Sequence, residues 1–351
     1  MATMDTTSDL YQQSGLKNLD DILGERSAPP PCANQHFFGR GKLLLTGEYF
    51  VLDGAKSLAL PTKAGQRLSV TYRPSFSPTL SWSSYDVNGD LWFKGEFEFW
   101  HLSCIDKNPS DKAIFLEKIL QQIRKQNPHF LRDNFSVEVE THLGFPIEWG
   151  LGSSSSLIYD LAQWAYISAF ELNAKTLGGS GYDIACAGGN GPLTYEIKSK
   201  RPAWGPVSFN PSFKENIYFI YQGEKKCSRE GIKYYKSQKE KFGKSVYQSL
   251  TEITEKILTC QTLKEFEFLI DTHEDIIASN LLLPKLKDEC FGDYWGSIKS
   301  LGAWGGDFAM VTSDRSELET LQYFTIKGID VFLPFSDLIE MGTTGMSEGA
   351  L

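Results

Sequence analysis

A short glycine- and serine-rich stretch at residues 146–156 is the feature that most constrains how this chain can fold. It reads Pro-Ile-Glu-Trp-Gly-Leu-Gly-Ser-Ser-Ser-Ser. Before it, apolar and polar residues alternate over residues 134–142, which is the period of a half-buried strand. After it, apolar residues recur at helical spacing from Leu157 to Phe170. We therefore expect two glycines and four hydroxyls at the start of a helix.

This position suits an anion. The start of a helix has unpaired N–H groups and the positive end of the helix dipole, and both attract phosphate. Glycines let the backbone approach the anion without a side chain in the way. The competing interpretation is an ordinary serine-rich turn with a serine N-cap. The stretch is not a Walker A loop, because no Gly-Lys-Ser/Thr follows the glycines.

Composition narrows the classes of partner. The chain has 351 residues, 41% of them hydrophobic, which suffices for a core and about two domains. A net charge of −9 without lysine or arginine blocks argues against nucleic acid. The cysteines are dispersed, as is usual for reduced thiols in the cytosol. Without a secretory signal, or an apolar run near the ~18 residues that span a bilayer, we expect a cytoplasmic protein that uses no membrane.

The mixture of strand and helix patterns predicts an α+β protein of two domains. We expect an N-terminal extension over residues 1–36, a first domain over 37–205, a second domain over 206–340 and a tail over 341–351. The segment 202–211, rich in proline, tryptophan and glycine, is expected to cross between the domains.

Apolar patterns also locate further elements. The Asn88-Gly89 pair predicts a hairpin turn. Helices are expected over residues 111–126 and 317–326 and, in several segments, over 230–287. The expected strands are 42–45, 49–52, 68–72, 193–197, 217–221, 297–300, 307–312 and 331–333.

Three further glycine-containing stretches carry residues suited to chemistry. Residues 41–54 place Lys42 at the entry of a strand and Glu48 at its exit. Residues 178–183 read Gly-Gly-Ser-Gly-Tyr-Asp, so Asp183 could accept or orient a substrate hydroxyl proton. Residues 301–307 read Leu-Gly-Ala-Trp-Gly-Gly-Asp between two strands. Plain alternatives are a solvated lysine, an N-cap aspartate and a hairpin turn.

Together these stretches resemble the motifs of the GHMP kinases, which include galactokinase and the homoserine, mevalonate and phosphomevalonate kinases. Residues 146–154 resemble the second motif, Pro-x-x-x-Gly-Leu-Gly-Ser-Ser. Residues 41–54 resemble the first motif in the form of the mevalonate and phosphomevalonate branch. Residues 301–307 are similar to the third motif, although Trp304 stands where the family usually has a small residue.

The aspartate stretch fits the same family. Ser180-Gly181-Tyr182-Asp183 resembles the Ser-Gly-x-Asp segment that carries the proposed catalytic aspartate of mevalonate-type kinases. Residues 181–185, Gly-Tyr-Asp-Ile-Ala, are similar to the signature of a bacterial subfamily. The resemblance implies a two-domain fold, with an N-terminal domain like ribosomal protein S5 domain 2 and a ferredoxin-like C-terminal domain.

The resemblance also implies roles for particular residues. ATP and Mg²⁺ would be the cofactors, and Ser154 would be a Mg²⁺ ligand with Glu171 as a candidate second one. Asp183 would activate the acceptor hydroxyl, assisted by Lys42. The residues implied for nucleotide binding are Gly150, Leu151, Gly152, Ser153, Ser154 and Ser155. Those implied on the acceptor side are Glu48, Gly181, Tyr182, Gly302, Ala303, Gly305 and Gly306, and a structural role is the alternative for Glu48. Lys63 and Lys299 are candidates to receive the acceptor's charge.

The function implied is transfer of the ATP γ-phosphate to a small anionic acceptor, mevalonate or 5-phosphomevalonate. The alternatives are a sugar-type GHMP kinase, a non-catalytic GHMP paralogue that binds a ligand, and a diphosphomevalonate decarboxylase of the same fold. The oligomeric state is left open, with a homodimer as one option.

Overall fold

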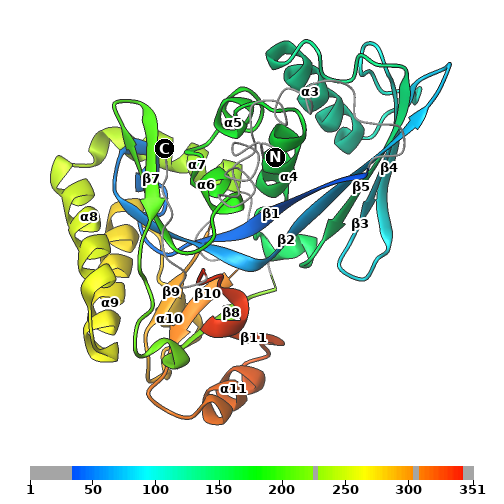
Figure 1. The fold of residues 1–351 in the computed structure, drawn as a ribbon. Helices are drawn as coiled ribbons and strands as arrows, with labels where there is room; N and C mark the ends of the chain where they lie inside the picture. The colour runs from blue at the N-terminus through cyan, green and yellow to red at the C-terminus, as the bar shows by residue number, and fades with distance from the viewer. Residues whose placement is uncertain (1–33, 224–227, 303–307, 343–351) are drawn as a thin grey trace, which may run out of the picture. The chain divides into compact units, whose positions relative to one another are not determined.

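The computed structural model describes residues 34–223, 228–302 and 308–342 (Figure 1). The expected extension before residue 34 and the tail after residue 342 lie outside the described residues, as do Ala303, Trp304, Gly305 and Gly306 of the third motif. The chain forms two compact units, which it enters more than once: residues 1–36, 69–83 and 93–140 in the first, and 37–68, 84–92 and 141–351 in the second.

The strands form a seven-stranded and a four-stranded sheet within the described ranges. The larger sheet has the order β4-β3-β5-β2-β6-β7, and β1 pairs with β2. Its strands are β1 (Asn34–Leu44), β2 (Ser57–Pro74), β3 (Thr79–Tyr85), β4 (Leu91–Glu98), β5 (Phe135–Leu143), β6 (Leu193–Lys198) and β7 (Arg201–Pro206). The smaller sheet has the order β11-β8-β10-β9. Its strands are β8 (Ile217–Tyr221), β9 (Ile298–Ser300), β10 (Phe308–Thr312) and β11 (Val331–Pro334).

The described residues also form α-helices and short 3₁₀ turns. They are α3 (Asp111–Gln126), α4 (Ser153–Trp164), α5 (Ala169–Thr176), α6 (Tyr182–Ala187), α7 (Ser228–Gln238), α8 (Lys244–Thr259), α9 (Leu263–Leu281), α10 (Leu286–Cys290), α11 (Glu317–Ile326) and α12 (Phe335–Leu338). Short 3₁₀ turns are η1 (Phe50–Asp53), η2 (Ile147–Trp149), η3 (Lys214–Asn216) and η4 (Lys239–Lys241). None of the helices in the described part of the chain is long and apolar enough to cross a bilayer.

Helix α3 is the main helix of the first unit. The Ser110 side chain accepts a hydrogen bond from the Ala113 N–H at 3.2 Å and so caps the helix. Its apolar residues lie on one face and are buried: Ala113, Leu116, Ile119, Leu120 and Ile123. In its last turn, Arg124 donates to the carbonyl oxygens of Trp100 and Leu131 at 3.0 and 2.8 Å. These bonds tie the C-terminal end of α3 to the loops on either side of it.

One of the apolar clusters in the second unit contains residues of both sheets. The members come from β1 and β2, from β8 and β10, and from α8, α9 and α12; among them are Leu43, Leu58, Phe219, Ile257, Ile270, Met310 and Phe335. Leu151, between the two glycines of the 146–156 stretch, belongs to this cluster and is fully buried. Burial of this leucine anchors the glycine stretch to the core of the second unit.

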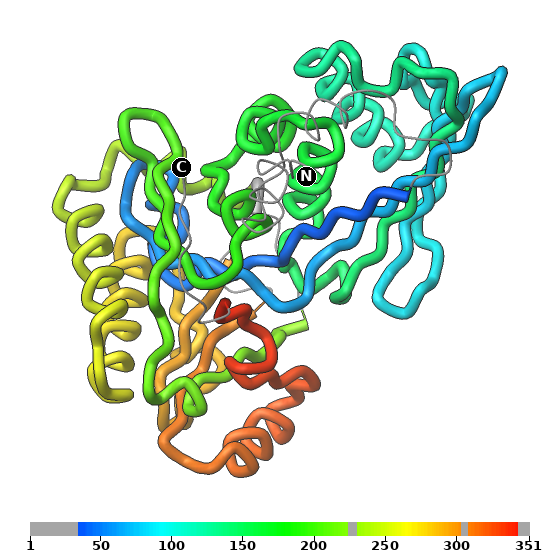
Figure 2. The backbone as a smooth tube through the Cα atoms, viewed as in Figure 1, coloured from blue at the N-terminus to red at the C-terminus, as the bar shows by residue number. Residues whose placement is uncertain are grey.

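Most expected elements are confirmed, and three differ. The helical run expected from Leu157 to Phe170 is divided between α4, which ends at Trp164, and α5, which begins at Ala169. Residues 49–52 were expected to form a strand, but Phe50–Asp53 form the 3₁₀ turn η1, in which the Leu52 N–H donates to the Tyr49 carbonyl three positions earlier at 3.0 Å. A short apolar run marks burial and does not by itself distinguish a strand from a buried turn. Residues 202–206, expected to cross between domains, lie in β7 and pair antiparallel with β6, a hairpin that can be followed in Figure 2.

The close approach of β1 and β2 gives a test of the fold. A Cβ on Gly65 would lie 2.3 Å from the carbonyl oxygen of Gly39, a backbone atom that cannot move without parting the strands. We expect Gly65→Ala to lower the free energy of unfolding by at least about 1–3 kcal/mol in urea titrations. Gly205→Ala in β7 is the matched control, because no atom lies within 4 Å of its added Cβ. Equal losses in the two variants would contradict this reading of the sheet.

Candidate functional site

Two left-handed glycines lead the chain into helix α4. Gly150 ends η2 with φ 65°, and Gly152 precedes the helix with φ 93°, a region that residues with a Cβ rarely adopt. No side chain caps the helix, and the N–H groups of Ser155 and Ser156 both donate to the Gly152 carbonyl at 3.0 Å. The N–H groups that precede Ser155 come before this ladder, so they are the donors that a helix start offers to an anion.

Strand β1 lies directly against this glycine loop through Lys42. The Lys42 backbone N–H donates to the Leu151 carbonyl at 2.9 Å, and its Nζ donates to the Gly150 carbonyl at 2.8 Å. A Cβ on Gly152 would lie 3.1 Å from the Lys42 Cγ. The first and second sequence motifs are therefore in contact, and a glycine at position 152 is favoured by both its φ angle and its neighbour.

The aspartate stretch joins the same place. Helix α6 begins after Gly181, whose φ is 91°. The Ser155 hydroxyl of α4 donates to Asp183 Oδ2, and Asp183 Oδ1 accepts from the Ile184 N–H at 3.1 Å. The sequence predicted Ser155 and Asp183 as site residues separately. The structure connects them by a side-chain hydrogen bond across 28 positions of the chain.

A cation and an aromatic ring accompany this carboxylate. The Lys42 Nζ lies 6.0 Å from the centroid of the Tyr182 ring. The pKa of the Cys186 thiol is raised first by burial and then by the charge of Asp183, whereas the charge of Lys42 lowers it. Both charges thus act on the same buried atom of α6. The arrangement can hold a polar group between a carboxylate, an ammonium group and the start of a helix.

Sequence reasoning missed one ionisable residue of α4. Asp160 is fully buried, and neither carboxyl oxygen has a hydrogen-bond partner among the described residues. Burial raises the pKa of Asp160 to about 9, so the group is uncharged at neutral pH. A neutral Asp160 adds no negative charge to the helix whose N-terminus faces the glycine loop. The polar residue on an otherwise apolar helix face was the available signal.

The expected metal ligands are simple oxygen donors. Ser154 is exposed in the first turn of α4. Glu171 is exposed on α5 and forms an ion pair with Lys175 one turn later. Residues 34–223, 228–302 and 308–342 contain no group of three His, Cys, Asp or Glu side chains suited to a metal. This donor set fits Mg²⁺, which takes few protein oxygens together with phosphate and water. Both ligand roles stay predictions.

The acceptor-side residues are only partly described. Gly302 follows β9 with φ 70°, but Ala303, Gly305 and Gly306 lie outside the described residues. Lys63 is exposed on β2. Lys299 of β9, the other candidate for an acceptor's charge, is fully buried instead.

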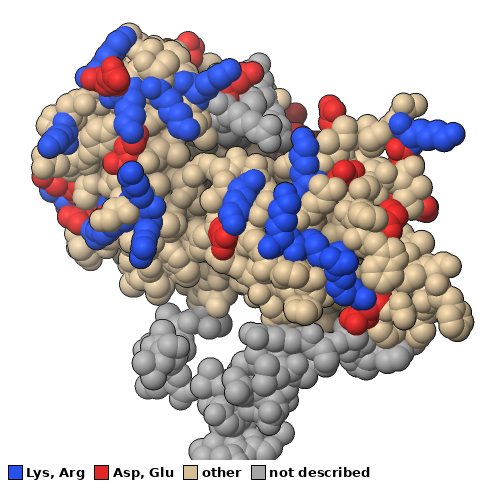
Figure 3. All heavy atoms as spheres, turned by 90° about the horizontal axis from the view of Figure 1, so that it is seen from above, with Lys and Arg blue, Asp and Glu red and all other residues tan. Residues whose placement is uncertain are grey.

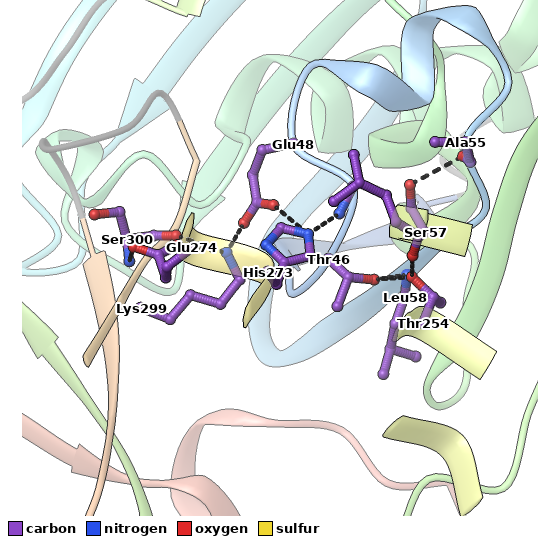
Figure 4. Close-up of polar contacts among 12 residues, drawn as sticks. Thr46, Glu48, Ala55, Ser57, Leu58, Thr254, His273, Glu274, Lys299 and Ser300 are labelled. Carbon is purple, nitrogen blue, oxygen red and sulfur yellow. Dashed lines mark hydrogen bonds and ion pairs between the residues drawn. The ribbon is translucent and has the colours of Figure 1, made fainter. Parts of the chain in front are cut away.

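Lys299 belongs to a buried ionic cluster with Glu48, His273 and Glu274 (Figure 4). Its Nζ donates to Glu48 Oε1 at 2.5 Å and to Glu274 Oε1 at 3.1 Å. Nε2 of His273 accepts the Gly47 N–H at 2.9 Å and lies 3.4 Å from Glu48 Oε2. The charge of Lys299 is therefore balanced inside the protein, which does not suit the acceptor-binding role suggested for it.

Burial shifts the ionisation of this cluster. The pKa of Glu274 is raised to about 7 by burial, against the lowering effect of Lys299. Burial likewise raises the pKa of Glu48, again against Lys299. The pKa of His273 is lowered well below its usual value by burial and by Lys299, so its ring is neutral and can accept the Gly47 N–H. One lysine thus faces two carboxyl groups, and the protonated form of Glu274 is the one that folding favours.

The raised pKa of Glu274 predicts a pH-dependent stability. Its contribution is fully present below its ordinary pKa of 4.5 and is lost as the pH rises through about 7. The wild-type protein should therefore lose up to about 3 kcal/mol more free energy of unfolding than Glu274→Gln between pH 4.5 and 7.5. Urea titrations at several pH values measure the difference. Glu255→Gln, at an exposed ion pair with Lys56, should run parallel to the wild type; a parallel Glu274→Gln curve would refute the prediction.

This chain resembles known proteins in structure and not in sequence. Neither a protein-family model nor the sequence of a curated protein matches this chain. Solved structures do match. The mevalonate kinase of L. major in complex with R-mevalonate is 14% identical, with a TM-score of 0.64, over 91% of this chain and 100% of that one. The Streptococcus pneumoniae phosphomevalonate kinase in complex with phosphomevalonate and AMPPNP is 17% identical, with a TM-score of 0.61, over 85% and 98%.

A galactokinase shares the same architecture. The Lactococcus lactis enzyme complexed with galactose is 12% identical, with a TM-score of 0.60, over 96% of this chain and 98% of that one. These matches run over nearly the whole length of each enzyme. The α+β architecture expected from the motifs is thereby confirmed, and the chain has the fold of the GHMP kinase superfamily.

Proposed function

We propose that this protein is an ATP-dependent GHMP kinase that phosphorylates the hydroxyl of a small anionic acceptor, mevalonate or 5-phosphomevalonate. The observation that carries the proposal is the hydrogen bond from Ser155 to Asp183. It holds a carboxylate at the start of the helix that follows the glycine loop. A phosphate-binding helix start and a proton acceptor are the two components that phosphoryl transfer to a hydroxyl requires.

The proposed reaction uses the chain's own groups for binding and proton transfer. The triphosphate lies against the N–H groups of residues 150–154, where the backbone can approach it closely. The acceptor hydroxyl oxygen forms a bond to the γ-phosphorus, and the bond from that phosphorus to the β–γ bridging oxygen breaks with its electron pair leaving on ADP. The hydroxyl proton passes to Asp183. Lys42, whose charge acts on the same Cys186 thiol as that of Asp183, offsets negative charge as the phosphoryl group moves.

Mg²⁺ supplies neutralisation of phosphate charge when it is bound. Ser154 and Glu171 are the residues that we assign to it, because a hydroxyl and a carboxylate are oxygen ligands of the kind that this ion takes. Neither residue is given a part in the proton transfer.

The proposed acceptor class rests on the first motif and on the mevalonate and phosphomevalonate kinases among the similar structures. The galactokinase match keeps a sugar hydroxyl as the second candidate. The S. aureus mevalonate diphosphate decarboxylase is also similar, with a TM-score of 0.54. On the face drawn in Figure 3, acidic side chains lie among the lysine and arginine side chains. Such a mixed face suits a small ligand better than a nucleic acid. We assign the reaction to the cytoplasm.

A panel of acceptors tests the activity. The full chain is incubated with Mg·ATP and each of mevalonate, 5-phosphomevalonate, 5-diphosphomevalonate, galactose and homoserine. ADP release is followed, and products are identified by mass spectrometry. A phosphorylated mevalonate or phosphomevalonate supports the proposal. Transfer to galactose alone, release of CO₂ from the diphosphorylated acceptor, or ATP binding without transfer to any acceptor would each contradict it.

Asp183 is the residue whose loss should affect catalysis most directly. We expect Asp183→Asn to lower kcat by about 10²- to 10⁴-fold, because the hydroxyl proton loses its acceptor. ATP affinity, measured by calorimetry, should stay within about threefold of the wild type, since the helix start is unchanged. Asp293→Asn is the control, because that aspartate is exposed and forms an ion pair with Lys327 at the C-terminal end of α11. Unchanged turnover in Asp183→Asn would remove the proposed base.

Substitutions of Ser154 and Ser155 should distinguish a metal ligand from a residue that positions Asp183. Ser155→Ala should lower kcat by about 10- to 100-fold with little change in the Mg²⁺ requirement, because a hydrogen bond to a charged group is lost. Ser154→Ala should raise the Mg²⁺ concentration needed for half-maximal rate instead. Steady-state kinetics at varied Mg²⁺ distinguish the two. If both substitutions changed only the Mg²⁺ requirement, the hydrogen bond to Asp183 would have no role in turnover.

A further inference from the structure

Glu48, His273, Glu274 and Lys299 form a cluster of four buried ionisable side chains in the second unit. All four side chains are at most 2% exposed. Buried ionic groups contribute little net stability, since desolvation opposes their attraction. The effect of the cluster therefore lies mainly in the two chain segments that it holds in place.

One side of the cluster fixes the turn that follows β1. Glu48 is held by Lys299, and the N–H of the preceding Gly47 donates to His273. A Cβ on Gly47 would lie 2.1 Å from the Ser57 Oγ, so this turn is tightly enclosed as well. Just upstream, the Thr46 hydroxyl shares a 2.8 Å hydrogen bond with Thr254 of α8 (Figure 4). Three consecutive residues of the turn are thus anchored to helices α8 and α9 and to β9.

The anchored turn is the continuation of the strand that carries Lys42. Lys42 lies six positions before Glu48, and both its backbone N–H and its Nζ bond to the carbonyls of the glycine loop. Displacement of the turn therefore displaces the end of β1, and with it the contacts to Gly150 and Leu151. The strand is the physical link between the buried charges and the helix start at Ser153.

The other side of the cluster fixes the end of β9. Glu274 Oε2 accepts the Ser300 N–H at 3.3 Å, and the Lys299 Nζ also donates to the Ser300 carbonyl at 3.2 Å. Ser300 is followed two positions later by the left-handed Gly302. The same ammonium group therefore holds the turn after β1 and the strand end before Gly302.

We propose that Glu48 is a positioning residue, which through Lys299 fixes the end of β1 and so holds Lys42 and the glycine loop in register. Its catalytic consequence rests on the proposed kinase function. Both carboxylate oxygens of Glu48 face the protein: its Oε1 is bound by Lys299, and its Oε2 is buried beside the His273 ring. Glu274, which is bonded to the same lysine, holds the end of β9 through the Ser300 N–H.

Two isosteric variants form a matched pair. Glu48→Gln and Glu274→Gln each remove one of the two carboxylates and leave Lys299 paired with the other one. Only Glu48→Gln weakens the link to β1. Hydrogen–deuterium exchange of the full chain without ligand should then show several-fold faster exchange over residues 37–45 and 146–153 in Glu48→Gln, whereas Glu274→Gln should match the wild type there. Equal exchange in the two variants would overturn the proposal. This readout does not depend on any activity.

A double-mutant cycle extends the test to turnover. Glu48→Gln should lower kcat by about tenfold, with acceptor KM within about threefold of the wild type. In a Lys42→Met background the same substitution should cost less than about twofold, because the positioned group is already gone. A selective rise in acceptor KM, or full multiplicative losses, would show Glu48 acting on the acceptor directly. If no acceptor is turned over by the wild type, the kinase proposal fails, and the exchange experiment still decides the positioning role.

Discussion

The site depends on the left-handed backbone at Gly150 and Gly152. This conformation turns the chain from η2 into α4, whose first N–H groups no side chain caps. The turn is held from two directions, because Leu151 is buried in the core of the second unit and Lys42 donates hydrogen bonds to the carbonyls of Gly150 and Leu151. A side chain at position 152 would meet both an unfavourable φ angle and the Lys42 stem. The loop is therefore rigidly placed before any ligand binds.

Charge is distributed around this loop in a consistent way. Lys42 and Asp183 are two ionisable groups near the helix start, and Asp183 is tied to α4 by Ser155. The buried carboxyl of Asp160, further along α4, is neutral at pH 7 because burial raises its pKa to about 9. The remaining buried charges are gathered on Lys299 and its two carboxylates, where attraction offsets desolvation. An anion at the helix start therefore meets one fixed cation and one fixed carboxylate.

Local patterns predicted most of the elements with useful accuracy. Alternating residues located β5, the periodic run at 111–126 located α3, and Ser316 with Glu319 forms a capping box where α11 was expected to begin. Residues 49–52 and 202–206 have compositions that fit several conformations. The first stretch forms a buried 3₁₀ turn whose Phe50 ring packs on Tyr235 of α7, and the second forms a proline-containing edge strand paired with the neighbouring β6. Neither structure leaves a periodic pattern in the sequence.

By itself the sequence determined the glycine turns, the helix that follows them and the residue types available for chemistry, because these depend on local backbone preferences and on spacing along the chain. Only the tertiary structure decided which of those residues meet. It placed Ser155 on Asp183 and withdrew Lys299 and Glu48 into a buried ion pair. The physical reason is that burial and ion pairing are set by groups hundreds of positions apart, such as Glu48 and Lys299, which are separated by 251 residues. No local sequence pattern predicts such a contact, whereas a glycine by itself indicates where the backbone can adopt a positive φ angle.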